Sequence, residues 1–114
     1  MTERIRVKPS DIHGRGVFAV HEVPRGGLLE NGELLPLPAD EPGASCTIVN
    51  YVFELTRTRT CLLLGSVSLC NHSDSPNAEV EIDPTGGTYR LLALRKIRRG
   101  EEILIDYGKN YWET

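Results

Sequence analysis

The sequence predicts a mainly β fold of several short strands with little helix. Glycine and proline account for 11 and 7 of the 114 residues and interrupt the chain at short intervals. Between these interruptions lie short apolar or alternating segments, which are typical of strands, and no apolar pattern of helical period is long enough to dominate. A chain of this length supports one modest core, so we expect a single domain over residues 1–114.

The N-terminal segments predict the first strands. Residues 4–8 alternate polar and apolar side chains, which indicates a strand at a sheet edge. The apolar run 17–20 follows a glycine-containing turn and predicts a buried strand. Asn31-Gly32 lies between the leucine pairs 28–29 and 34–35. Because Asn-Gly suits a type I′ turn with positive φ at both central residues, this pattern predicts a hairpin.

The middle of the chain is less regular. Three prolines and a glycine between residues 36 and 43 predict a surface loop. Residues 50–56 alternate in the manner of a strand, although Ile48, Val52 and Leu55 also fit one face of a helix. Residues 60–64 predict the next strand after a turn rich in threonine and arginine.

The last part of the chain carries clearer β signals. Residues 79–82 and 89–94 flank the turn sequence Asp-Pro-Thr-Gly-Gly at 83–87, and this arrangement predicts a hairpin. The apolar segment 103–105 predicts a final strand after a glycine-containing turn.

Composition excludes several classes of protein. The net charge of −3 argues against nucleic-acid binding by bulk electrostatics, and we expect no direct nucleic-acid partner. No apolar run approaches the roughly 20 residues of a membrane span, and the N-terminus does not begin a secretory signal. We therefore expect no membrane association and an intracellular location, in the cytoplasm or the nucleus.

The cysteines and histidines do not predict a metal site. Cys46, Cys61 and Cys70 are odd in number and form no C-x-x-C pair, which disfavours both a disulfide framework and a structural zinc site. His72 has Cys70 two residues away on the same face of a predicted strand, but two ligands do not complete a site. We expect no bound metal.

Three polar segments could carry chemistry. Gly14 and Gly16, with Arg15 between them, allow a sharp turn and a close backbone approach to a ligand, although a plain tight turn is the alternative. Asn71-His72 opens the polar run Asn-His-Ser-Asp-Ser-Pro-Asn at 71–77, which either caps its own turn or presents its side chains to a ligand. Tyr107 follows the last predicted strand, where its hydroxyl could orient a nucleophile or simply pack with Tyr111 and Trp112.

The order of these segments resembles the SET domain of protein lysine methyltransferases. Gly-x-Gly at 14–16 is followed by Tyr51, by Asn-His-Ser-x-x-Pro-Asn at 71–77, and by Gly-Glu-Glu-Ile-x-x-Asp-Tyr-Gly at 100–108. The last two segments are specific, and the resemblance covers nearly the whole chain. The sequence is similar to the minimal, single-domain SET methyltransferases of viral type. The resemblance implies a fold of several small sheets with a C-terminal pseudoknot.

The resemblance also implies an activity and a role for each matching residue. It implies S-adenosyl-L-methionine as the cofactor and methyl transfer to a lysine in a basic protein segment such as a histone tail. Tyr107 matches the catalytic tyrosine. The residues that match cofactor-binding positions, or that would close over the cofactor, are Gly14, Arg15, Gly16, Asn71, His72 and Trp112. The residues implied to line the substrate channel are Tyr51, Ile105 and Tyr111.

The sequence departs from the family pattern at two points. Ile105 occupies a position that is often Phe or Tyr; it has no hydroxyl to hold a water, which favours a site that permits di- or trimethylation. The cysteine-rich zinc segment that follows many SET domains is not found after Tyr107, so Tyr111 and Trp112 are the candidates to close the site. A homodimer that completes the substrate groove is a further hypothesis. The alternatives to an enzyme are a catalytically inactive SET-like binding module and a small structural β-barrel.

Overall fold

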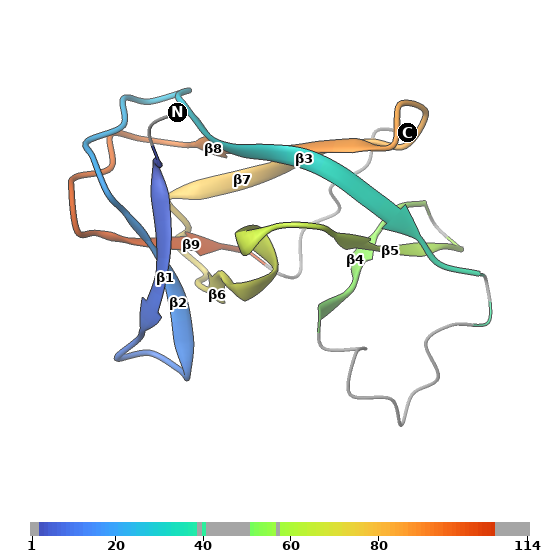
Figure 1. The fold of residues 1–114 in the computed structure, drawn as a ribbon, viewed down its shortest axis with the longest axis horizontal. Coiled ribbons are helices and arrows are strands. Elements are labelled where there is room, and N and C mark those ends of the chain that lie inside the picture. Colours follow the sequence, from blue (N-terminus) through green and yellow to red (C-terminus); the bar gives the residue numbers. More distant parts are fainter. Residues whose placement is uncertain (1–2, 39, 41–50, 57, 107–114) are drawn as a thin grey trace.

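Two β-sheets make up most of the domain in the computed structural model, which describes residues 3–38, 40, 51–56 and 58–106 (Figure 1). One sheet has the strand order β1-β2-β9-β6 and the other has the order β4-β5-β3-β8-β7. A 3-10 helix, η2 (Ser66–Leu69), precedes β6. The strands are β1 (Ile5–Pro9), β2 (Arg15–Ala19), β3 (Leu28–Pro36), β4 (Phe53–Glu54), β5 (Thr60–Leu63), β6 (Asn71–His72), β7 (Ala78–Asp83), β8 (Thr88–Ala93) and β9 (Glu102–Ile105). The predicted mainly β fold with little helix is confirmed.

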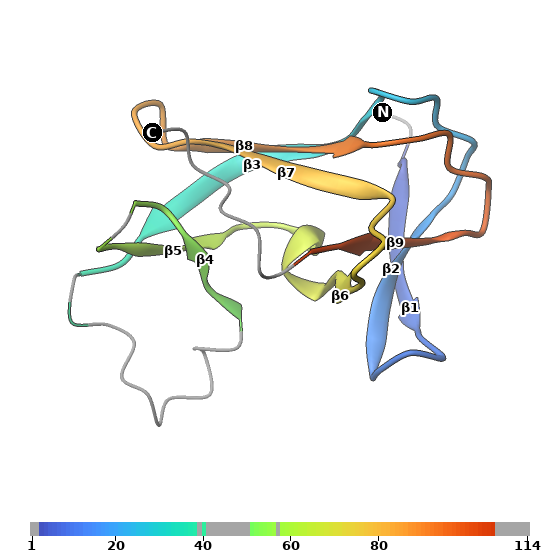
Figure 2. The ribbon, with the colours of Figure 1, turned by 180° about the vertical axis from the view of Figure 1, so that it is seen from behind.

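The four-stranded sheet joins segments that are far apart in the sequence. β1 lies at its edge, as residues 4–8 predicted, and pairs antiparallel with β2. β9 lies between β2, to which it is antiparallel, and β6, to which it is parallel. The two views from opposite sides show β9 crossing close to β2 and β6 (Figures 1 and 2). The predicted pseudoknot also involves residues 107–114, which lie outside the described residues.

The hairpin predicted around residues 83–87 is confirmed. β7 and β8 pair in continuous register from Ala78 opposite Ala93 to Asp83 opposite Thr88. The Asp83 carboxylate accepts hydrogen bonds from the backbone N–H groups of Thr85 and Gly86, at 3.1 and 2.9 Å. Gly87 adopts a φ of +71°, a left-handed conformation that glycine tolerates well.

The hairpin predicted at Asn31-Gly32 is wrong. These residues lie inside the continuous strand β3, where they pair with Arg90 and Tyr89 of β8. Neither has a positive φ, so no type I′ turn forms. Gly32 serves close packing instead, because a Cβ atom at this position would lie 3.1 Å from the Tyr89 hydroxyl oxygen. Pairing with β8 therefore overrides the local turn signal.

The strand predicted over residues 50–56 is shorter than expected. It is reduced to β4, which pairs with β5 through Phe53 opposite Cys61. Tyr51 lies outside the strand. The strand predicted over 60–64 is confirmed as β5. Of the predicted loop at 36–43, Pro36 ends β3, residues 37, 38 and 40 lie outside strands, and the others are outside the described residues.

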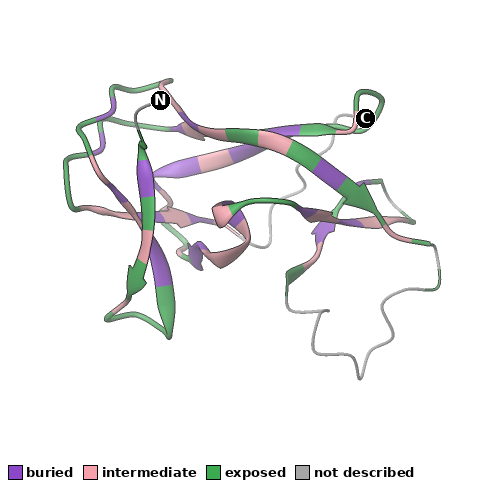
Figure 3. Ribbon diagram, viewed as in Figure 1, coloured by how far each residue is buried: buried purple, intermediate pink, exposed green. Residues whose placement is uncertain are grey.

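Both sheets contribute to one core, which the buried segments of the ribbon mark (Figure 3). The thiols of Cys61 and Cys70 are buried within this core, and Cys46 lies outside the described residues. Burial raises the pKa of the Cys61 thiol to about 11 and raises that of Cys70 further. No helix in the described ranges is long and apolar enough to span a membrane. The largest fully buried side chains are Tyr89, Leu91, Ile97, Ile103, Ile105, Val17 and Val67.

Candidate functional site

The side-chain amide of Asn71 lies at the centre of a polar cluster. Asn71 begins β6 and is 8% exposed. Its Nδ2 atom donates toward the backbone carbonyl oxygens of His13 and Arg15, at 3.1 and 3.3 Å. The same nitrogen lies 3.1 Å from Ser10 Oγ and 2.8 Å from Glu102 Oε2. The amide thus holds the glycine-containing turn against the start of β6.

Ser10 and Glu102 complete this cluster. The Ser10 hydroxyl donates to the Glu102 carboxylate, with distances of 2.8 Å to Oε1 and 3.0 Å to Oε2. Ser10 Oγ also accepts the backbone N–H of Ile12 at 3.0 Å. Glu102 starts β9, so this carboxylate connects three segments: the turn after β1, β6 and β9.

The two glycines of the turn serve different structural purposes. Gly14 has a φ of +50°, and a Cβ atom added there would meet nothing within 4 Å. Gly16 is buried in β2, and a Cβ atom there would lie 2.2 Å from Glu102 Oε2 and 3.1 Å from Asn71 Nδ2. Gly14 provides the left-handed backbone of the turn, whereas Gly16 provides the space that the Asn71–Glu102 contact occupies.

Gly16→Ala is expected to lower the free energy of unfolding by about 2–3 kcal/mol, because the new methyl group displaces the Glu102 carboxylate from Ser10 and Asn71. Gly14→Ala is the matched control, and it should cost about 1–2 kcal/mol from backbone strain alone. Urea unfolding of both variants and of the wild type measures the difference. Equal stability of Gly16→Ala and wild type would mean that the carboxylate moves aside freely.

Asn77 attaches β9 to the polar run that follows β6. It is 2% exposed, and its Oδ1 atom accepts the backbone N–H of Leu104 at 2.8 Å. Its Nδ2 atom donates to the backbone carbonyl of Glu102, also at 2.8 Å. The backbone N–H of Asn77 donates to the Leu104 carbonyl at 3.1 Å. The two asparagines of the 71–77 segment therefore bind β9 and the glycine turn together.

A second carboxylate stabilises the turn that leads into β9. Glu101 forms an ion pair with Arg95 and accepts the backbone N–H of Arg98 at 3.0 Å. The Arg95 guanidinium is the main cause that lowers the pKa of Glu101, to about 2, with help from the Arg98 N–H and Asn77 and against the opposing effect of desolvation. Glu101 therefore stays ionised throughout the physiological range of pH.

The remaining predicted site residues are distributed around this cluster. Arg15 is exposed and contributes its carbonyl oxygen. His72 points away from the cluster: its Nε2 lies 2.9 Å from Asp74 Oδ1 and its Nδ1 lies 3.8 Å from Asp106 Oδ1. Ile105 is fully buried and pairs with His72, whereas Tyr51 is 43% exposed. Tyr107, Tyr111 and Trp112 lie outside the described residues.

The sequence did not reveal the contributions of Ser10 and Glu102. Glu102 lies within the Gly-Glu-Glu-Ile segment that helped to define the resemblance, but nothing in that segment distinguishes it from Glu101. Ser10 is 61 residues from Asn71 and 92 from Glu102, and it belongs to no motif. Only the pairing of β1, β2, β9 and β6 brings these side chains together.

Comparison with known proteins identifies the family of this chain. The sequence profile of the SET domain matches residues 14–108. The chain is 28% identical over 111 residues to a histone-lysine N-methyltransferase of Schizosaccharomyces pombe that is specific for H3 lysine-37, covering 95% of this chain and 76% of the relative. It is 30% identical over 113 residues to the N-lysine methyltransferase KMT5A-A of Danio rerio, of which it spans only 32%.

Solved structures show the same fold. A crystal structure of a Plasmodium falciparum protein that is provisionally assigned as a histone methyltransferase superimposes with a TM-score of 0.82 at 30% identity, over 99% of this chain and all of the other. A Chaetomium thermophilum Polycomb Repressive Complex 2 structure gives 0.76 at 20% identity, over 99% of this chain and 16% of the other, and supports the fold alone. The chain belongs to the SET domain family of protein lysine methyltransferases.

Proposed function

We propose that this chain is an S-adenosyl-L-methionine-dependent protein lysine N-methyltransferase that acts on a lysine in a basic segment such as a histone tail. The observation that carries the proposal is the Asn71 cluster, in which the two family motifs and the glycine turn meet through direct hydrogen bonds. The names of the relatives support a histone substrate. The intracellular location and the completion of the substrate groove by a homodimer remain predictions.

The Asn71 cluster has the chemistry to hold the amino-acid end of the cofactor. Both amide hydrogens of Asn71 point toward oxygen atoms, and among the described residues no donor reaches its Oδ1. This oxygen and the carbonyl groups of the 13–15 turn are acceptors, which suit an ammonium group. When bound, the cofactor would supply an electrophilic methyl group on a sulfonium. Gly14, Arg15, Gly16, Asn71 and His72 would hold it, with Trp112 closing the site.

The proposed substrate residue must lose its charge before it reacts. A lysine has an unperturbed pKa of about 10.4, and only the neutral amine is nucleophilic. A narrow, partly apolar channel disfavours the ammonium form and lowers this pKa. We assign Tyr51, Ile105 and Tyr111 to the channel and Tyr107 to orienting the amine. Alignment of this kind can supply roughly 7–11 kcal/mol of the barrier.

Two measurements test the proposal. Calorimetric titration with S-adenosylhomocysteine should show binding, and a radiolabelled assay on histones should show methyl transfer to lysine, with mass spectrometry identifying the product. Tyr107→Phe should reduce methyl transfer at least about tenfold, because a loss of this size or more is typical of a group that acts on the reacting atoms. The same substitution should leave S-adenosylhomocysteine binding near normal. Transfer by Tyr107→Phe at the wild-type rate would refute the assigned role. Absence of both binding and transfer would favour an inactive SET-like binding module.

A further inference from the structure

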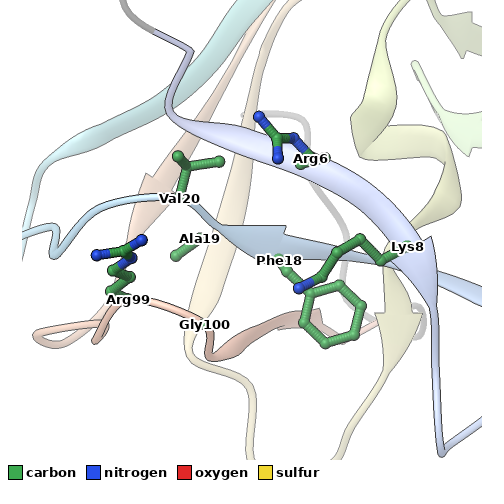
Figure 4. A pocket seen from close by; sticks show the side chains of 7 residues that line it. All are labelled: Arg6, Lys8, Phe18, Ala19, Val20, Arg99 and Gly100. Atoms are coloured by element: carbon green, nitrogen blue, oxygen red, sulfur yellow. The ribbon is translucent and has the colours of Figure 1, made fainter.

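A small cationic cavity lies on the four-stranded sheet, next to the Asn71 cluster, because Lys8 pairs with Gly16 and Phe18 pairs with Glu102. Its volume is about 140 Å³. Arg6 and Lys8 reach it from β1, Phe18 from β2, and Arg99 from the turn that precedes β9 (Figure 4). Arg6 and Lys8 are two residues apart on one strand, so they project from the same face of the sheet. The described lining contains no acidic side chain.

The cations of this cavity are only partly neutralised. Lys8 Nζ lies 5.0 Å from the centre of the Phe18 ring, a cation–π contact that leaves its positive charge in place. Arg6 pairs with Glu3 at 2.9 Å, but both side chains are more than half exposed, so the pair is weak. Within the described ranges, Lys8 and Arg99 have no carboxylate within ion-pair distance.

The positive charge continues beyond the cavity. Arg98 is exposed next to Arg99 and likewise has no ion-pair partner among the described residues. Both arginines line a neighbouring cavity whose lining also includes the Glu101 carboxylate, which is paired with Arg95. The result is an exposed basic strip that consists of Arg6, Lys8, Arg98 and Arg99. The strip holds four of the 13 lysine and arginine residues of a chain whose net charge is −3. A net-charge argument does not detect such a strip.

We propose that the basic strip binds the phosphate backbone of duplex DNA. A group of neighbouring exposed arginine and lysine side chains suits a polyanion, and three of the four are arginines, whose planar guanidinium groups match phosphate oxygens. DNA presents one charge per roughly 1.7 Å of its axis, which lets several side chains bind at once. Contacts to phosphate oxygens carry no sequence information, so this contact would be independent of sequence. This proposal differs from our expectation from bulk charge and does not depend on methyl transfer.

Fluorescence anisotropy with a short labelled DNA duplex tests the proposal at about 50 mM and about 200 mM salt. The wild type should bind with the weak affinity of a non-specific contact, and binding should fall with salt. Lys8→Gln with Arg99→Gln should weaken binding about tenfold and reduce the salt slope by about 2. Arg25→Gln with Arg90→Gln removes the same charge from exposed positions outside the strip and should change affinity less than about threefold.

Three outcomes would overturn the proposal. The first is no binding by the wild type at the lower salt concentration. The second is an equal loss in the two charge-matched double variants, which would mean that only net charge matters. The third is displacement of the duplex by a polyglutamate peptide of equal charge as effectively as by unlabelled DNA, which would indicate an acidic protein partner. Thermal melting of both double variants verifies that they are folded.

Discussion

Asn71→Asp is expected to weaken S-adenosylhomocysteine binding at least a hundredfold, or by about 3 kcal/mol, although the substitution keeps the size of the side chain. The aspartate removes the donors that hold the His13 and Arg15 carbonyl oxygens. It also places a second carboxylate at the 2.8 Å contact with Glu102, where like charges repel. If Asn71 acted only by offering an acceptor to the ligand, the aspartate would be tolerated. Calorimetric titration distinguishes these two roles.

A second substitution tests the Asn71–Glu102 contact directly. In the Asn71→Asp/Glu102→Gln double variant, the glutamine amide can donate to the aspartate and restore one bond with the donor and acceptor exchanged. We expect this double variant to be about 1–2 kcal/mol more stable to unfolding than Asn71→Asp. The like-charge repulsion disappears in it, while the loop carbonyl groups stay unpaired. A double variant no more stable than Asn71→Asp would show that the contact contributes little. Urea unfolding of the single and double variants gives the coupling energy.

Asn77→Ala is expected to give the largest loss of stability, about 3–4 kcal/mol. The side chain is almost fully buried and bonds the Leu104 N–H and the Glu102 carbonyl, both at 2.8 Å. Its removal leaves two backbone groups of β9 without these partners, and each unsatisfied buried group costs about 1–3 kcal/mol. For a domain of this size the melting temperature should fall by roughly 10–20 °C.

Differential scanning calorimetry measures this change, with Asn31→Ala as the control. Asn31 is exposed on β3, so its replacement should shift the melting temperature by no more than a few degrees. A melting temperature for Asn77→Ala within about 3 °C of the wild type would contradict the assigned role. It would show that water or neighbouring groups readily replace the asparagine.

Much of the fold is predictable because its signals are local. Alternation in residues 4–8 and the apolar runs at 17–20 and 103–105 correspond to β1, β2 and β9, since side-chain period depends only on neighbouring residues. The turn at 83–87 is likewise encoded by its own aspartate and glycines. The motif order also identified Gly14, Gly16 and Asn71, which the structure joins in one cluster.

The wrong prediction of a hairpin at Asn31-Gly32 has a physical cause. Asn31-Gly32 has the residues of a tight turn, yet ladder pairing with β8 and packing against Tyr89 hold it in an extended strand. A local turn preference of about 1 kcal/mol is outweighed by many long-range contacts.

The amino-acid sequence by itself determined the class of fold, most of the strand positions and the motif residues, because these depend on short-range pattern. The tertiary structure alone decided which oxygens Asn71 holds, that Asn77 secures β9, and that Lys8 and Arg99 line one cavity. Ser10 and Glu102 are 92 residues apart, and no local pattern encodes their hydrogen bond. Such contacts follow from strand order, which depends on the burial of the whole core rather than on any one segment.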